Sequence, residues 1–173
     1  MSLQLVDSVT VTSAVASVFL TGINDDSVYV CIVTNASNLS GDYQLRMRVA
    51  NSSTQDTAGN YDYAYTLLRS NNDEFQGAVQ NAGFFAASTS GTSTVEVQNY
   101  IMYLYNWYDS AKYSNWSYEE CSFDANSSVA GVQGAAVFDQ TERHDSIRFY
   151  SGTSASTEAD TTQGKFSLYK VVS

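Results

Sequence analysis

The 173-residue sequence has no proline, two cysteines, one histidine and only eight lysines and arginines. Without proline, prolyl isomerisation cannot slow folding, and turns must depend on glycine, asparagine, aspartate and serine. Two cysteines and one histidine do not make a four-ligand zinc site. We expect Cys31 and Cys121, each inside a strand-like run, to be free and buried, because no export signal points to an oxidising compartment.

Basic residues are too sparse for a nucleic-acid interface. The net charge is −10, from 18 acidic and eight basic residues. Only Arg46 and Arg48 lie close together, and phosphate contacts need clusters of lysine and arginine. The sequence therefore predicts no direct binding to nucleic acid, and we interpret the acidity as favouring solubility.

Long apolar runs are also missing. No stretch approaches the roughly 20 apolar residues that span a bilayer. The first residues, MSLQLVDSVTV, lack the basic start and apolar core of a signal peptide. We expect synthesis in a cytoplasm, and either retention there or departure within a larger assembly, with no membrane partner.

What the chain does contain is strand-forming sequence. The central stretch, residues 95–108 (VEVQNYIMYLYNWY), alternates at first and then becomes apolar or aromatic on both faces. This pattern is typical of a central strand, exposed at its start and covered on both faces at its end. With 13 tyrosines and no long helical pattern, we predict an all-β, single-domain, jelly-roll-like antiparallel β-sandwich over residues 1–173.

The remaining strands follow from alternation and turn signals. Residues 1–20 should form either an extended N-terminal arm or edge strands, and residues 71–79 either one helical turn or a short strand. In 43–49 (YQLRMRV), Arg46 and Arg48 are expected to face water. The TERHDS segment should place His144 in a solvated charged turn. Further strands are expected near residues 28–33, 61–69, 83–88, 111–123, 129–138, 146–150 and 165–172.

No pattern points to catalysis, and we predict that the protein is not an enzyme. His144 has no G-x-S-x-G partner, and Glu119 and Glu120 are adjacent, so on a strand they point to opposite faces. Oxygen-rich clusters at 24–26 and 71–74 could offer calcium ligands but match no EF-hand, and we interpret them as turns. The sequence therefore predicts no catalytic residue, no bound metal and no cofactor.

An aromatic set is the candidate contact surface. Such rings serve as core, as subunit interface or as platforms for sugars, and all three roles remain open. The set consists of Tyr103, Tyr105, Trp107, Tyr108, Tyr113, Trp116 and Tyr118.

The C-terminal half carries a recognisable order of motifs. VEVQNY is followed by DSAKYSNW, GVQGAAVF, SIRFYSGTSAS and finally GKFSLYKV, with Gly164, Phe166, Leu168 and Tyr169 standing out. Over residues 95–173 this resembles small tailed-bacteriophage virion proteins, especially of marine and cyanobacterial phages, that end in an Ile-Arg-Phe…Gly-x-Phe-x-Leu-Tyr signature. Their usual Leu-Tyr-Gly-Ile ending is here Leu168 to Val171, with Lys170 in place of glycine.

The resemblance implies a jelly-roll or related β-sandwich without catalysis on the virion exterior. We hypothesise a capsid decoration protein that binds the major capsid protein or other virion subunits and stabilises the head. A homotrimer is expected by analogy. The alternative is a tail fibre or adhesin domain that binds host glycan through Trp107, Trp116 and nearby tyrosines. A third hypothesis is a hydrolase of host glycans that uses Glu119 and Glu120.

Overall fold

The computed structural model describes residues 2–38, 44–71, 74–89, 96–123, 128–154, 157–159 and 162–172. Its secondary structure is entirely β within these ranges. The strands are β1 (Ser2–Val15), β2 (Ser17–Thr21), β3 (Tyr29–Asn38), β4 (Gln44–Asn51), β5 (Thr54–Gln55), β6 (Tyr61–Arg69), β7 (Glu74–Ala82), β8 (Phe85–Thr89), β9 (Gln98–Tyr105), β10 (Ser114–Phe123), β11 (Val129–Phe138), β12 (Ser146–Ser154), β13 (Thr157–Ala159) and β14 (Thr162–Val172).

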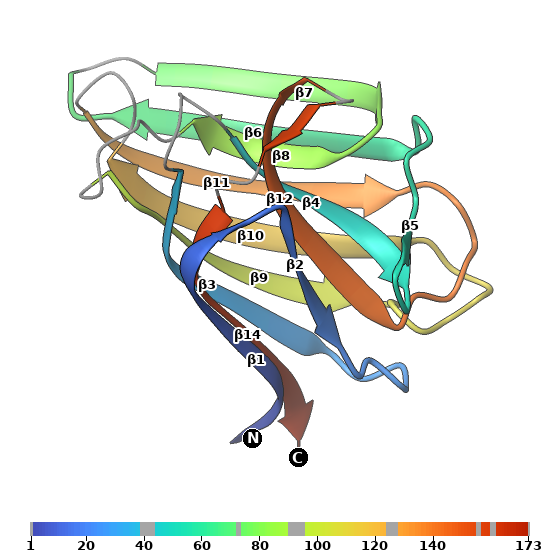
Figure 1. Ribbon diagram of the computed structural model, residues 1–173. Coiled ribbons are helices and arrows are strands. Elements are labelled where there is room, and N and C mark those ends of the chain that lie inside the picture. The colour runs from blue at the N-terminus through green and yellow to red at the C-terminus, as the bar shows by residue number, and fades with distance from the viewer. Residues whose placement is uncertain are drawn as a thin grey trace.

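The strands form two sheets that pack face to face (Figure 1). Sheet A has eight strands in the order β1-β14-β3-β9-β10-β11-β6-β7. Sheet B has six, with β13-β12-β4-β5 as its path, β2 paired to β12 and β8 paired to β4. The predicted all-β antiparallel sandwich is confirmed. The finer jelly-roll assignment stays a prediction.

Strand β9 occupies the interior position that the sequence predicts, between β3 and β10. Its side chains alternate along its whole length, with Gln98, Tyr100, Met102 and Leu104 buried toward sheet B. The expectation that its second half is covered on both faces is wrong, because Tyr103 and Tyr105 are exposed on the outer face of sheet A.

An aromatic cluster joins the two sheets. Phe85 of sheet B packs edge-on against Trp116 and Tyr118 of sheet A, with ring centroids 5.5 and 4.7 Å apart. Trp107 packs against Trp116 at 5.6 Å and donates from its indole Nε1 to the carbonyl of Ser146 in β12. Burial of rings this large is a major source of the free energy that holds the sheets together.

His144 lies in the core, so the prediction of a solvated turn is wrong. The residue is 1% exposed, and its ring packs edge-on against Phe138, with centroids 5.0 Å apart. The backbone amide of His144 donates to the carbonyl of Trp107. These contacts draw the histidine inward while Glu142 and Arg143 beside it stay exposed.

Arg46 and Arg48 are also buried, contrary to the expectation that they face water. They project from the outer face of sheet B, where their guanidinium groups lie over aromatic rings: Arg46 over Phe84 at 3.9 Å and Arg48 over Tyr150 at 4.7 Å. Arg48 also donates to the carbonyl of Gly83. Stacking and hydrogen bonding let arginine occupy such a site, which the alternation of apolar and polar residues does not reveal.

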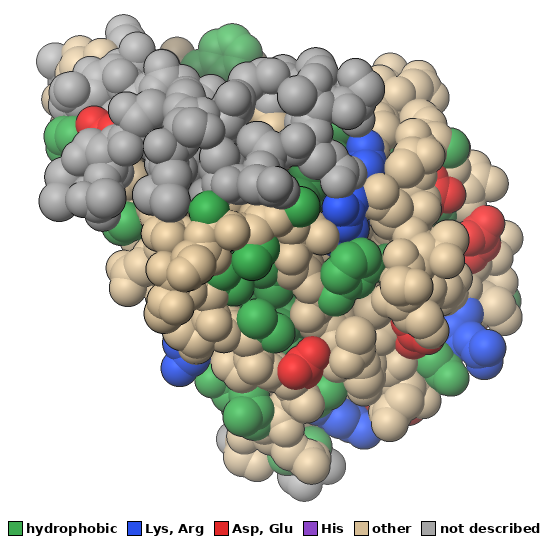
Figure 2. Space-filling view, in the orientation of Figure 1, with side chains coloured by type: hydrophobic (Ala, Val, Ile, Leu, Met, Phe, Trp, Pro, Cys, Tyr) green, Lys and Arg blue, Asp and Glu red, His purple; other side chains and the backbone are tan. Residues whose placement is uncertain are grey.

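The two ends of the described chain lie side by side (Figure 1), because β1 pairs along β14 with Ser2 opposite Val172. Strand β1 is thus an edge strand of sheet A, one of the two predicted alternatives. Leu3 and Leu5 on it are more than half exposed. On the side of the molecule seen in Figure 2, acidic and basic side chains are scattered over the described surface without a broad basic patch. The described residues contain no helix that is long and apolar enough to cross a membrane.

Candidate functional site: a cross-strand groove

The seven aromatic residues of the candidate set do not form one surface. Trp107, Trp116 and Tyr118 are buried in the core, one of the three roles left open for this set, and neither tryptophan is exposed for the alternative role of glycan contact. Tyr103 and Tyr105 project from the outer face of sheet A, 40% and 36% exposed. Tyr113 is exposed in the β9–β10 connection, and Tyr108 lies partly buried under the guanidinium of Arg143. Only Tyr103 and Tyr118 lie at the groove described next.

The outer face of sheet A carries a row of small side chains that crosses four strands. The strand registers place Ser117 beside Ala135, Ala135 beside Ala64, and Ala64 beside Ala78. Because directly opposed residues share one face, these four residues form a continuous low channel perpendicular to the strands. Tyr103 is opposite Ser117 and stands at the β9 end of this small-residue row.

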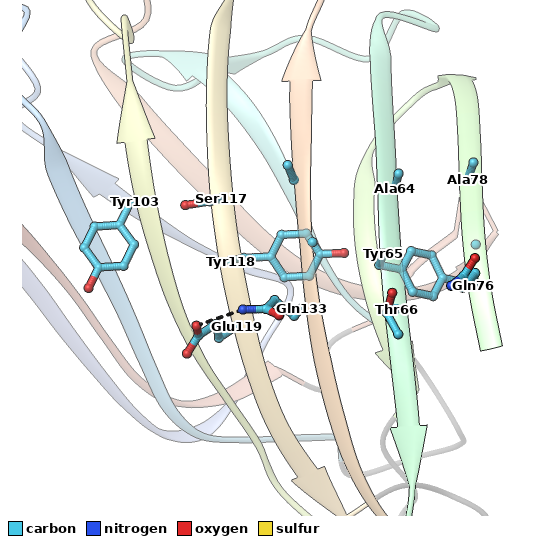
Figure 3. A pocket seen from close by; sticks show the side chains of 13 residues that line it. Ala64, Tyr65, Thr66, Gln76, Ala78, Tyr103, Ser117, Tyr118, Glu119 and Gln133 are labelled. Carbon is cyan, nitrogen blue, oxygen red and sulfur yellow. Dashed lines mark hydrogen bonds between the residues drawn. The ribbon is translucent and has the colours of Figure 1, made fainter. Parts of the chain in front are cut away.

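A polar row runs parallel to it, displaced by two residues on each strand. It consists of Glu119, Gln133, Thr66 and Gln76, which are successive register partners. Gln133 donates from Nε2 to the Glu119 carboxylate oxygen Oε1 at 3.3 Å, a bond that holds both side chains over the groove (Figure 3). The two rows form the floor and one wall of the cross-strand groove.

On the inner face of the sheet beneath the groove, tyrosine side chains pack closely over glycines of the neighbouring strands. Tyr118 lies opposite Gly134, and Tyr65 lies opposite Gly77. A Cβ on Gly134 would lie 2.7 Å from the Tyr118 hydroxyl, and one on Gly77 would lie 2.5 Å from the Tyr65 ring. Each tyrosine therefore covers the neighbouring strand where that strand has no side chain (Figure 3).

The cross-strand groove has a volume of about 760 Å³. Two smaller depressions adjoin it along the strands, one of about 370 Å³ that shares Ala64, Ala78 and Ala135, and one of about 340 Å³ that shares Thr66, Glu119 and Gln133. The five strands from β9 to β7 extend over roughly 19 Å at the usual strand spacing. The groove is therefore long enough for an extended ligand and too open to enclose a small one.

The groove offers hydrogen-bond acceptors, some of them negatively charged, and uncharged hydrogen-bond donors. Among the described residues that line it and its two neighbours, Asp62 and Glu119 are the exposed or half-exposed carboxylates, and none is lysine or arginine. Burial raises the pKa of the Tyr118 phenol far above its usual range and also raises that of Tyr65. Both phenols are therefore neutral at physiological pH.

Neither the oxygen-rich clusters nor the adjacent glutamates form a metal centre or a carboxylate pair among the described residues. No group of three or more His, Cys, Asp or Glu side chains that could hold a metal occurs among them. In the first oxygen-rich cluster, the Asp25 carboxylate accepts a hydrogen bond from the Ser27 amide at 3.0 Å and pairs with Lys170, as a turn residue would. In the second cluster, Asn72 and Asp73 lie outside the described residues. Glu119 is exposed, whereas Glu120 is 5% exposed on the opposite face, as their adjacency predicts.

The cysteines are both free thiols, as expected, but they differ in environment. Cys31 is buried, and burial raises its pKa well above the usual range. Cys121 is exposed on the outer face of sheet A, so the prediction that it is buried is wrong.

Comparisons with known proteins add little. No protein-family model matches the chain, and no curated protein matches its sequence. Among solved structures, a fructofuranosidase variant from Schwanniomyces occidentalis in complex with fructosylnystose is similar with a TM-score of 0.22 and 8% identity. The alignment covers 98% of this chain but only 34% of that one, so this chain spans about a third of its length. A likeness this slight carries no functional argument.

Proposed function

We propose that this protein is a non-enzymatic surface component of a tailed-phage virion, and that its cross-strand groove binds an extended glycan of the host surface. The observation that carries the glycan assignment is the small-residue row between Tyr103 and Ala78, flanked by the polar row. The virion assignment rests on the resemblance of residues 95–173 to phage virion proteins.

Glycans suit this groove because of how their two kinds of surface match its two rows. The methyl groups of Ala64, Ala78 and Ala135 present a flat apolar floor for the C–H faces of sugar rings. The carboxylate of the polar row can accept hydrogen bonds from sugar hydroxyl groups, and its amide groups can both accept such bonds and donate them. An extended peptide would instead seek a sheet edge, where unpaired backbone groups are available.

The small-residue row provides a direct test. Ala135→Leu and Ala64→Leu each raise the floor into the groove while their side chains stay outside the core. We expect glycan binding about tenfold weaker or worse, because a steric cost of about 1.4 kcal/mol already gives that factor. Binding would be measured on a glycan array and on isolated host envelopes.

The control is Ala111→Leu, the same change at an exposed position in the β9–β10 connection, which should bind as the unaltered protein does. Stability of all three variants should change by less than about 0.5 kcal/mol, as is usual for exposed sites. Absence of binding to every arrayed glycan and to host envelopes would refute the proposal.

Capsid decoration is the second candidate function, and the exposed apolar residues of β1 favour it. Leu3 and Leu5 are exposed beside the C-terminal strand, where they could bury apolar surface against the major capsid protein. Immunogold labelling of purified virions separates the candidates: label over the head supports decoration, and label at the tail or its fibres supports an adhesin. Virions without label would exclude both.

A further inference from the structure

The charge of the cross-strand groove bears on whether uncharged or acidic glycans would bind there. We propose that the groove selects uncharged glycans. In this proposal Glu119 accepts hydrogen bonds from their hydroxyl groups and repels carboxylate or sulfate substituents. This inference rests on the proposed glycan binding and goes further by naming the chemical class of the ligand.

The first argument is the charge around the groove. Its described lining residues include Glu119 and, in the adjoining depression, Asp62, without any lysine or arginine. The net charge of the whole chain has the same sign, at −10. An anionic polymer that approaches this face therefore meets repulsion at long range and at contact, whereas an uncharged polymer meets neither.

The second argument is the geometry of Glu119. Its Oε1 accepts from the Gln133 amide at 3.3 Å, which fixes the carboxylate over the groove (Figure 3). An ionised carboxylate is an acceptor only, and a hydroxyl donor gives it a strong, charge-assisted hydrogen bond. Sugar hydroxyl groups can donate this bond. A uronate or sulfate group placed there offers oxygen acceptors and a like charge.

The third argument is the opposite end of the polar row. Thr66 and Gln76 continue the row with neutral groups that both donate and accept, so every polar position of this wall can pair with a hydroxyl. None of these positions supplies the cation that acidic polysaccharides usually require. The wall as a whole thus matches a polyol and not a polyanion.

The test compares polymers that share a backbone and differ in charge. Affinity electrophoresis would use hydroxyethylcellulose against carboxymethylcellulose, dextran against dextran sulfate, and agarose against carrageenan. We expect retardation by a neutral member and at least about fivefold weaker binding of its acidic counterpart, the factor given by two like charges 4 Å apart in water. Added salt should narrow this difference by screening.

Glu119→Gln keeps the shape of the side chain and removes its charge. We expect it to reduce the neutral-to-acidic ratio to less than about twofold, with about tenfold weaker binding of the neutral polymer from loss of a charge-assisted bond. Glu74→Gln is the matched control: it removes one negative charge from an exposed position of β7 outside the groove lining, and should leave the ratio unchanged.

The outcomes separate this inference from the function on which it rests. Equal retardation by neutral and acidic members overturns the selectivity and leaves glycan binding intact. An unchanged ratio in Glu119→Gln overturns the role of Glu119. Retardation by none of the polymers, together with no binding to host envelopes, overturns both the selectivity and the proposed function.

Discussion

At the scale of single residues, His144 illustrates how a polar side chain is held in an apolar core. Its Nδ1 lies 3.0 Å from the Ser114 hydroxyl, and its other nitrogen has no hydrogen-bond partner among the described residues. A carboxylate oxygen of exposed Glu142 is 4.0 Å from Nε2. Burial lowers the pKa of His144 to about 4 from a usual value of 6.5.

This pKa predicts a loss of stability in mild acid. Below pH 6.5 the unfolded chain binds a proton at this histidine, whereas the folded protein does not until about pH 4. The unfolding free energy should therefore fall as the pH drops through this window, by up to about 3 kcal/mol. Urea titrations at a series of pH values would measure the slope.

His144→Asn is the control, because an amide can accept from Ser114 but does not titrate. The variant should lose most of the slope between pH 6.5 and 5, where the carboxylates contribute least. An unchanged slope in that window would show that groups other than His144 cause it.

Single residues also show where prediction from sequence succeeds and fails. The opposite orientations of Glu119 and Glu120 follow from strand geometry alone and were predictable. The burial of His144, Arg46 and Arg48 depends on partners far away in the sequence, such as Trp107 for His144 and Tyr150 for Arg48. Local polarity contains no information about those partners, so these three residues were misplaced.

At the scale of elements, the strands were predictable and their registers were not. Alternation and turn residues located most of the strands of sheet A near their observed positions. The groove, however, exists because Ser117, Ala135, Ala64 and Ala78 fall into one row, and this depends on four pairings at once. The Gly/Ala content of β11 gives no indication that its outward side chains form the floor of a groove.

The tyrosine–glycine pairs predict opposite responses at two glycines of β11. A Cβ at Gly134 would lie 2.4 Å from the Ala64 carbonyl oxygen, whereas a Cβ at Gly131 meets nothing within 4 Å. Gly134→Ala should therefore lower the unfolding free energy by about 1–3 kcal/mol through overpacking.

Gly131→Ala is its control on the same strand, and should be neutral or raise stability by up to about 1 kcal/mol by restricting the unfolded chain. Chemical denaturation of both variants checks this contrast. Equal effects at the two positions would show that the Tyr118 ring and the Ala64 carbonyl can move aside without cost.

At the scale of the whole molecule, the tryptophans serve as reporters of contact between the sheets. Both are buried in the aromatic cluster that joins Phe85 of sheet B to Trp116 of sheet A. We expect tryptophan fluorescence and far-ultraviolet circular dichroism to change at the same denaturant concentration, as in two-state unfolding. Glycan binding on the outer face of sheet A should leave the tryptophan emission unchanged.

Phe85→Ala should shift both transitions together to lower denaturant, with a loss of about 3–5 kcal/mol. Phe75→Ala, at a half-exposed position on β7, should cost far less. A fluorescence transition that precedes the loss of secondary structure would indicate that the sheets separate before their strands unpair.

The pairing of β1 with β14 also determines how the molecule responds to mechanical load. Ser2 lies opposite Val172 at the open end of this antiparallel ladder (Figure 1). Tension between these two residues would open the ladder one rung at a time from that end, because antiparallel strands pulled apart at one end unzip instead of shearing. Tension between one of these strands and the rest of the sandwich instead loads many of the strand's hydrogen bonds at once. The sandwich should therefore withstand a far larger force when it is attached through one of these ends than when both ends are attached and pulled apart.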